Sequence, residues 1–381
     1  MTDVSVQPGV LEWALMRSGS RPALESKFPR LSEWLTGRKS PSLKQLEDFA
    51  RASRVPIGYL LLKEPPEEQL PVRDLRTIAS QGVRKPSPDL LDAIYLCQHR
   101  QAWYQEYAES IGEEPKAFAG SANLHRSPAT VAENIATTLK YGVQARQQST
   151  TRGEALRLFI DRAESVGILV MVSGVVGSNN HRKLDPKEFR GFALSDPLVP
   201  LIFINGADTK AAQMFTLAHE LAHIWLGESA VSDSGIATTP AQDVEKWCNQ
   251  VAAELLVPLA ELRRQLPSSG DPLRYLQPTA QAFKVSTLVI LLRFLDAGRL
   301  SRQGFQRAYD AELERLQQIQ RGSGGGDFYL TQPSRLSRRF ARAVITSTLE
   351  GQTLFRDAFQ MLGIKKEQTF RELGRALEVL E

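Results

Sequence analysis

The sequence has little cysteine and no long hydrophobic run. Its two cysteines, Cys97 and Cys248, lie far apart and neither belongs to a CxxC pair, which excludes a disulfide framework. No segment approaches the roughly eighteen uninterrupted apolar residues of a membrane span. Residues 1–4 begin neither a signal peptide nor an amphipathic transit peptide. We therefore expect a cytoplasmic protein that does not enter a membrane.

A strong excess of charge of one sign is absent as well. The 47 Lys and Arg residues nearly balance the 43 Asp and Glu residues, so the formal net charge is only +4. This excess permits contact with nucleic acid but does not require it. Hydrophobic residues make up 42% and charged residues 24%, which indicates a globular chain rather than a disordered one. At 381 residues the chain is too long for one compact core.

Proline and glycine divide the chain into four predicted segments. Residues 1–66 form a small helical domain, which ends at an EPPEE run because consecutive prolines stop a helix. Residues 67–165 form a helical linker or bundle, and residues 166–320 combine strands with helices. Residues 321–381 form a C-terminal helical module that begins with the flexible run RGSGGGD.

Three segments change from helical to strand-like patterning. Residues 167–172 (GILVMV), 189–194 (FRGFAL) and 198–205 (LVPLIFIN) are short, rich in β-branched or aromatic residues and bounded by turn residues. We predict that they form one small three-stranded sheet. Helical patterning returns at Lys210.

The helix that follows carries titratable residues on an apolar background. Residues 214–227 (MFTLAHELAHIWLG) are apolar on most sides, and Gly227 supplies a stop. His219 and His223 lie four residues apart on one face, so both imidazoles can reach a single Zn²⁺ at roughly 2.0–2.1 Å. Glu220 points to the side of that face, where it can reach a zinc-activated water without becoming a ligand. The alternative is a pair of buried histidines without metal.

A catalytic zinc site usually has a third protein ligand. The predicted helix over residues 244–256 offers Glu245 and Glu254, with Cys248 near the Glu245 face. We choose Glu245, which lies near the helix start and 22 residues after His223. Glu254 falls on a different face and is predicted to be a structural or surface carboxylate. Cys248 stays open as a softer alternative ligand.

The chemistry of such a site is hydrolysis of a peptide bond. Zinc lowers the pKa of its water to about 7, Glu220 takes the proton, and the hydroxide attacks a polarised carbonyl. Glu220 then returns the proton to the leaving amine. The strand before the helix could hold an extended substrate along its edge. The predicted substrate-edge residues are Leu201, Ile202, Phe203, Ile204 and Asn205.

With these residues placed, the sequence resembles the ImmA/IrrE family of zinc metallopeptidase-like regulators. The resemblance covers roughly residues 166–300 and rests on residues 189–194, 200–205, 215–223 and 245–258. In that family the glutamate of an ExxxN element is the third zinc ligand, which carries over to Glu245. The resemblance implies a mainly α-helical α+β fold with a zincin-like HExxH core.

The resemblance also implies a role. It suggests a cytoplasmic regulatory protease that cleaves a repressor or antitoxin-like partner, often encoded beside it, in phage, mobile-element or stress control. The competing hypothesis is a DNA-binding transcriptional regulator or antitoxin in which the zinc site is a sensor or a relic. Glu220 favours the enzyme, because a sensing site needs no general base. A homo-oligomer stays open.

The N-terminal segment resembles the XRE-like helix-turn-helix domain of longer family members through residues 34–46 (WLTGRKSPSLKQL). Ser42 is a predicted N-cap, and Gln45 completes its capping box. Such domains usually hold two full helices before the tryptophan, whereas residues from Gly19 to Trp34 leave room for one helix and a short turn. The basic side chains there would contact DNA phosphate or solvate a protein-interaction surface, and both interpretations stay open. They are Arg30, Arg38, Lys39 and Lys44.

Overall fold

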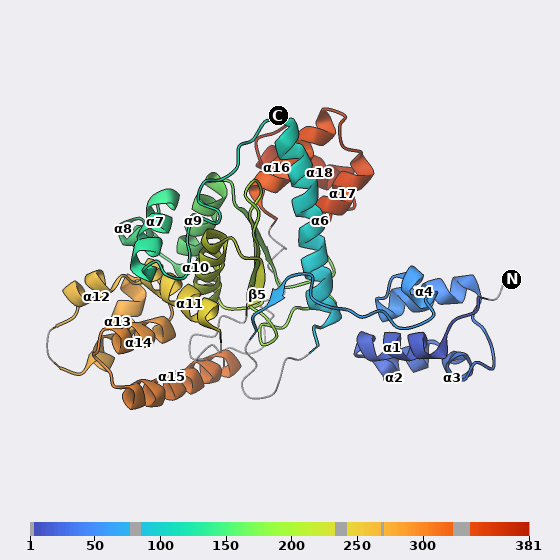
Figure 1. The fold of residues 1–381 in the computed structure, drawn as a ribbon, viewed down its shortest axis with the longest axis horizontal. Coiled ribbons are helices and arrows are strands. Elements are labelled where there is room, and N and C mark those ends of the chain that lie inside the picture. The colour runs from blue at the N-terminus through green and yellow to red at the C-terminus, as the bar shows by residue number, and fades with distance from the viewer. Residues whose placement is uncertain (1–3, 77–84, 233–241, 268–269, 323–335, 381) are drawn as a thin grey trace. The chain divides into compact units, whose positions relative to one another are not determined.

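The computed structural model describes residues 4–76, 85–232, 242–267, 270–322 and 336–380. The chain divides into two compact units, of which the first comprises Met1–Pro71 and Lys85–Asp92. The second comprises Val72–Arg84 and Ala93–Glu381. The protein is mainly helical with one small sheet, as predicted (Figure 1). Among the described helices, none is both long enough and apolar enough to cross a membrane.

The first unit contains five short helices around a core that includes Leu11, Trp34 and Phe49. The predicted capping box is confirmed. The Ser42 hydroxyl accepts a hydrogen bond from the Gln45 backbone N–H at 3.3 Å, and Oε1 of the Gln45 side chain accepts one from the Ser42 backbone N–H at 2.9 Å. The helices are α1 (Pro8–Ser18), α2 (Arg21–Lys27), α3 (Leu31–Leu35), α4 (Leu43–Ser53) and α5 (Ile57–Leu60).

The stretch between Gly19 and Trp34 holds two short helices instead of one helix and a turn. Helix α2 has seven residues and α3 has five. Pro22 lies in the first turn of α2, where the missing N–H costs no intrahelical hydrogen bond. Gly19 ends α1 with φ 64°, a conformation that glycine adopts without steric cost. The predicted turn is therefore a helix of little more than one turn.

The second unit is built on a five-stranded sheet. The three predicted strands are confirmed as β2 (Leu169–Ser173), β3 (Gly191–Leu194) and β4 (Leu201–Asn205). Two further strands, β1 (Arg73–Asp74) and β5 (Ala230–Ser232), were not predicted, because two or three residues are too short to show a period. The strand order is β1-β5-β3-β4-β2. Strand β4 is parallel to β2 and antiparallel to β3, and β5 is antiparallel to β3 and parallel to β1.

This order corrects the predicted substrate edge. Strand β4, residues Leu201–Asn205, lies between β3 and β2, so both sides of its backbone are already paired. All five of its residues are buried. No substrate strand can therefore add to it. The prediction was wrong because nearness to the motif helix along the chain does not reveal a strand's place in the sheet.

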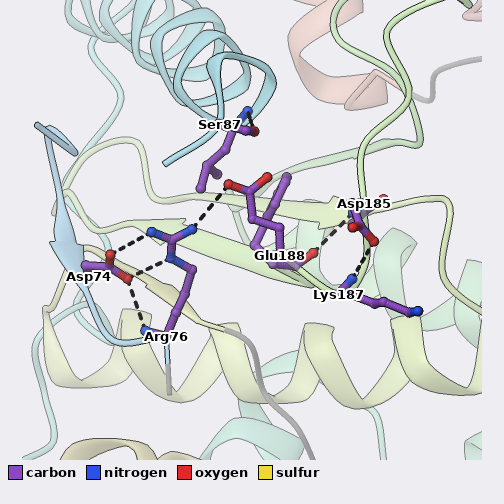
Figure 2. A network of polar contacts seen from close by, with 9 residues as sticks. Asp74, Arg76, Ser87, Asp185, Lys187 and Glu188 are labelled. Carbon is purple, nitrogen blue, oxygen red and sulfur yellow. Dashed lines mark hydrogen bonds and ion pairs between the residues drawn. The ribbon is translucent and has the colours of Figure 1, made fainter. Parts of the chain in front are cut away.

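A buried arginine, Arg76, connects β1 to the segment before β3 by hydrogen bonds and ion pairs (Figure 2). The Arg76 side chain is 2% exposed and bonds Asp74 at 2.7 and 2.8 Å. It also bonds Glu188, which precedes β3, at 3.4 Å. The neighbouring Leu75 is fully buried and donates its backbone N–H to the Val231 carbonyl of β5 at 3.0 Å. Residues 73–76 thus cover the outer edge of β5.

Four helices share one hydrophobic core with the sheet. They are α7 (Pro128–Leu139), α9 (Arg152–Ser165), α10 (Lys210–Leu226) and α11 (Asp243–Leu256). Helix α10 packs on β3 and α11, α9 packs on α10, and α7 packs mostly on α11. Figure 1 shows α9, α10 and α11 close together beside the sheet. Within the segment expected as a helical linker or bundle, α7 and α9 therefore contribute to the same core as the motif helix.

The remaining described elements complete the chain. They are α6 (Pro88–Ser110), α8 (Val143–Gln147), α12 (Leu259–Gln265), η1 (Pro272–Tyr275), α13 (Leu276–Ala282), α14 (Thr287–Asp296), α15 (Arg302–Gly322), α16 (Arg338–Leu349), α17 (Phe355–Leu362) and α18 (Glu367–Ala376). The last three helices pack on one another through α16.

Candidate metal centre

Helix α10 places three titratable side chains in the core. Thr209 caps its start by accepting from the Ala212 amide at 3.2 Å, and Gly227 ends it with φ 76°. Between these caps, His219, Glu220 and His223 are all fully buried. A buried charged or polar side chain costs free energy unless it has a partner. The helix therefore carries residues that need a compensating group in the core.

Helix α11 brings the third group to the histidines. Glu245 lies in the first turn of α11 and is 1% exposed. Small residues on the same helix, including Ala252 and Ala253, are buried as well, and α11 packs closely on α10. His219, His223 and Glu245 each offer one ligand atom, and these atoms all lie within 4.8 Å of one another. The structure thus brings together the three residues that were predicted as ligands.

The distances within this trio match the edges of a metal tetrahedron. His223 Nε2 lies 3.1 Å from His219 Nε2 and 3.1 Å from Glu245 Oε1. His219 Nε2 lies 3.4 Å from Glu245 Oε2. Ligand atoms at about 2.0–2.1 Å from one tetrahedral ion would be about 3.3 Å apart. The two nitrogens and the Glu245 carboxylate, each of whose oxygens lies near one nitrogen, therefore have the spacing of ligands around one divalent metal.

A hydrogen bond fixes the ring of His219 in the orientation that metal binding requires. Nδ1 of His219 lies 2.9 Å from Oδ1 of Asn249 on α11. Because an amide oxygen only accepts, Nδ1 must carry the proton, and the lone pair is left on Nε2. Such a partner orients a metal-binding histidine and raises its basicity. Asn249 thus supports the ligand set from one turn beyond Glu245.

The trio is electrostatically matched. Burial lowers the pKa of His219, but the neighbouring Glu245 carboxylate more than offsets this, and the pKa rises to about 9. Burial likewise raises the pKa of Glu245, but the His219 imidazole opposes it and holds that pKa at about 2. The site therefore favours a positive charge between these side chains. A divalent cation can supply that charge in place of a proton.

Glu220 belongs to the same buried region but not to the ligand trio. Its Oε1 accepts a hydrogen bond from the Ser232 hydroxyl of β5 at 2.5 Å. Its Oε2 is buried and has no hydrogen-bond partner among the described residues. Burial raises the pKa of this carboxyl, and the positive field of the two histidines opposes the shift. A buried carboxylate with a raised pKa and one free oxygen is suited to accept a proton.

The two alternative ligands, Glu254 and Cys248, are not part of this trio among the described residues. Glu254 forms an ion pair with Arg293 and accepts from the Leu259 amide at 3.2 Å. Cys248 is fully buried, and burial raises the pKa of its thiol well above the usual range. Within the described part of the chain, neither residue joins the trio.

The four predicted DNA-contact residues of the first unit are exposed, but two of them are engaged by acidic neighbours. Lys39 lies 2.8 Å from Glu33, and Lys44 lies 3.6 Å from Asp48. The Lys39 hydrogen bond lowers the pKa of the Glu33 carboxyl, and the charges of Arg30 and Arg38 lower it further. DNA contact by Arg30, Arg38, Lys39 and Lys44 stays a prediction.

Known proteins match two stretches of the chain. Residues 163–295 match the family described as the IrrE N-terminal-like domain, peptidase M78, and residues 336–376 match a domain of unknown function, DUF8813. Over 129 residues the chain is 33% identical to the radiation response metalloprotease IrrE of Deinococcus radiodurans. This alignment covers 32% of the chain and 38% of that relative, so the chain spans about two fifths of the relative's length.

Proposed function

We propose that this protein is a zinc-dependent endopeptidase that acts on a regulatory protein, because residues 163–295 match the IrrE N-terminal-like domain, peptidase M78. One observation carries the proposal. His219, His223 and Glu245 present their ligand atoms at tetrahedral spacing, and a fourth buried group, Glu220, has an oxygen without a partner in the described structure. A site built only to hold metal has no use for that carboxylate.

Each residue then has a separate task. His219, His223 and Glu245 hold the metal, and Asn249 keeps the His219 ring in place. When bound, zinc would polarise the peptide carbonyl and make a water molecule more acidic. Glu220 Oε2 accepts the proton of the attacking water and returns it to the nitrogen of the leaving amine. The apolar surroundings of α10 keep other water away and strengthen the electrostatic interactions at the site.

The proposed substrate is a repressor or antitoxin-like protein in the cytoplasm, often one encoded nearby. The name of the Deinococcus relative, a radiation response metalloprotease, supports a place in stress control. Mobile-element and toxin-antitoxin control follow from the same resemblance. The protein could also act as a homo-oligomer.

The test of the peptidase mechanism replaces only Glu220, the proposed general base. We expect Glu220→Gln to keep zinc and to lose cleavage of the regulatory protein encoded beside the gene, because the amide cannot take a proton. Glu254→Gln is the matched control: it removes a carboxylate from the same domain, outside the ligand trio, and should retain both zinc and cleavage. Equal cleavage by wild type and Glu220→Gln would refute the mechanism.

A second candidate is a regulator whose metal site senses rather than cleaves. Its support is the burial of the site: the three ligands and Glu220 are at most 1% exposed. A closed site suits a metal that stabilises one conformation. In this case zinc removal would change DNA binding by the first unit, whereas Glu220→Gln would leave both zinc and DNA binding unchanged.

A further inference from the structure

Strand β5 supplies a hydroxyl to the proposed general base. Ser232 is the last residue of this three-residue strand and is fully buried. Its hydroxyl donates to Glu220 Oε1 at 2.5 Å, a short charge-assisted contact. Neither the HExxH spacing nor the ExxxN element includes this residue.

The facing strand leaves room for the same carboxylate. Gly191 of β3 is the register partner of Ser232. A Cβ at this position would lie 3.1 Å from Glu220 Oε1, 2.5 Å from Thr216 Cγ2 and 2.8 Å from the Phe203 carbonyl. Any side chain at Gly191 would therefore displace its neighbours. The need for glycine here is spatial, since its φ lies outside the left-handed region.

These two contacts make the oxygens of Glu220 inequivalent. Oε1 is held by the Ser232 hydroxyl and lies close to the bare backbone of Gly191. Oε2 is equally buried, yet has no partner in the described part of the chain. Oε1 is therefore occupied by a donor, whereas Oε2 stays available to one. Rotation of the carboxylate would break the Ser232 bond, which keeps Oε2 as the free oxygen.

We propose that Ser232 is a positioning residue that anchors Oε1 of Glu220, with Gly191 providing the space, so that Oε2 alone is presented to the proton in transit. This inference rests on the proposed peptidase function. Among the described residues, the Ser232 hydroxyl bonds Glu220 and none of the three ligands. It acts by holding the base in one orientation, which lowers the entropic cost of reaching the reactive geometry.

A purely structural role for Ser232 predicts a different outcome. The hydroxyl would then only satisfy a buried carboxylate, and its loss would lower stability without a selective effect on turnover. A positioning role predicts a fall in kcat with KM and zinc content unchanged, because the lost interaction matters in the transition state.

The experiment uses the full-length zinc-loaded protein and the regulatory protein encoded beside its gene. We expect Ser232→Ala to lower kcat by roughly ten- to a hundredfold, the scale for a misplaced catalytic group, at unchanged KM and zinc content. Ser229→Ala is the control, because the Ser229 hydroxyl accepts from the Ser195 amide at 2.8 Å and does not contact Glu220. It should leave kcat unchanged. An unchanged kcat in Ser232→Ala would overturn the proposal.

A second readout does not depend on cleavage. Crystal structures of the zinc-loaded wild type and Ser232→Ala should show one Glu220 orientation in the former and several in the latter. The same single orientation in both would overturn the proposal even if no substrate is cleaved. Absence of cleavage by a fully zinc-loaded wild type would instead refute the peptidase function, and the crystallographic comparison would still decide the role of Ser232.

Discussion

Replacing Glu245 by alanine separates metal binding from stability. The variant leaves two imidazole nitrogens 3.1 Å apart and removes the only carboxylate of the described trio. Loss of a group that merely supports a ligand costs roughly 10–100-fold in metal affinity. Loss of the ligand itself should lower metal affinity further than loss of a supporting group, so we expect zinc affinity to fall by more than about 100-fold.

Glu254→Ala is the matched control on the same helix. It removes the ion pair with Arg293, whose side chain is 4% exposed. Removing one partner of a buried pair costs about 3–5 kcal/mol. Arg293 keeps Asp296 and the Val257 carbonyl, each at 2.8 Å, so we expect a smaller loss of about 1–3 kcal/mol. Zinc affinity should stay within a few-fold of wild type.

The assay pairs two measurements on each variant. Competition with a chromophoric chelator gives the zinc dissociation constant, and urea unfolding of the metal-free protein gives stability. We expect Glu245→Ala to lose zinc and Glu254→Ala to lose stability. The opposite pattern would move the third ligand to Glu254 and refute the geometric assignment.

Two further predictions concern pH and DNA. In the metal-free protein the raised pKa of His219, about 9 against 6.5, contributes stability below pH 6.5 that is lost as the pH rises through 9. The urea midpoint of the wild type should therefore fall more steeply between pH 6.5 and 9 than that of Glu245→Gln. Equal pH dependence of the two midpoints would contradict the interaction between His219 and Glu245. For the first unit, we expect binding to DNA from its own promoter that weakens steeply with salt. Arg38→Ala should weaken it more than Lys39→Ala, because Glu33 already holds Lys39 at 2.8 Å; no binding at low salt would indicate a protein-interaction domain.

The two histidines of the metal trio were predictable because their signal is local. His219 and His223 lie one turn apart on an apolar helix, which is a pattern visible in a short window. Glu245 lies on a second helix, and its place near the start of that helix favours it over Glu254 on spacing alone. The capping box at Ser42 is equally local. Structural features that depend only on residues within one or two helical turns, such as the histidine pair and the capping box, can be inferred from sequence.

The sheet around the site was only partly predictable, because its order depends on non-local pairing. Strand β4 was predicted as a strand but not as an interior one. Strands β1 and β5 are too short to show alternation, so Ser232 was missed together with β5. No pattern in the sequence connects Ser232 to Glu220, twelve residues away on a different element. The contact between Ser232 and Glu220 depends on how β5 pairs in the sheet, which the sequence does not reveal.

In the proposed function, His219, His223 and Glu245 hold zinc. X-ray absorption at the zinc edge of the purified full-length protein tests it directly. We expect one zinc per chain with a nitrogen and oxygen shell at about 2.0–2.1 Å, lost in Glu245→Ala. A sulfur shell at about 2.3 Å would make Cys248 a ligand and contradict the assignment. Protein that binds no zinc would contradict the claim altogether.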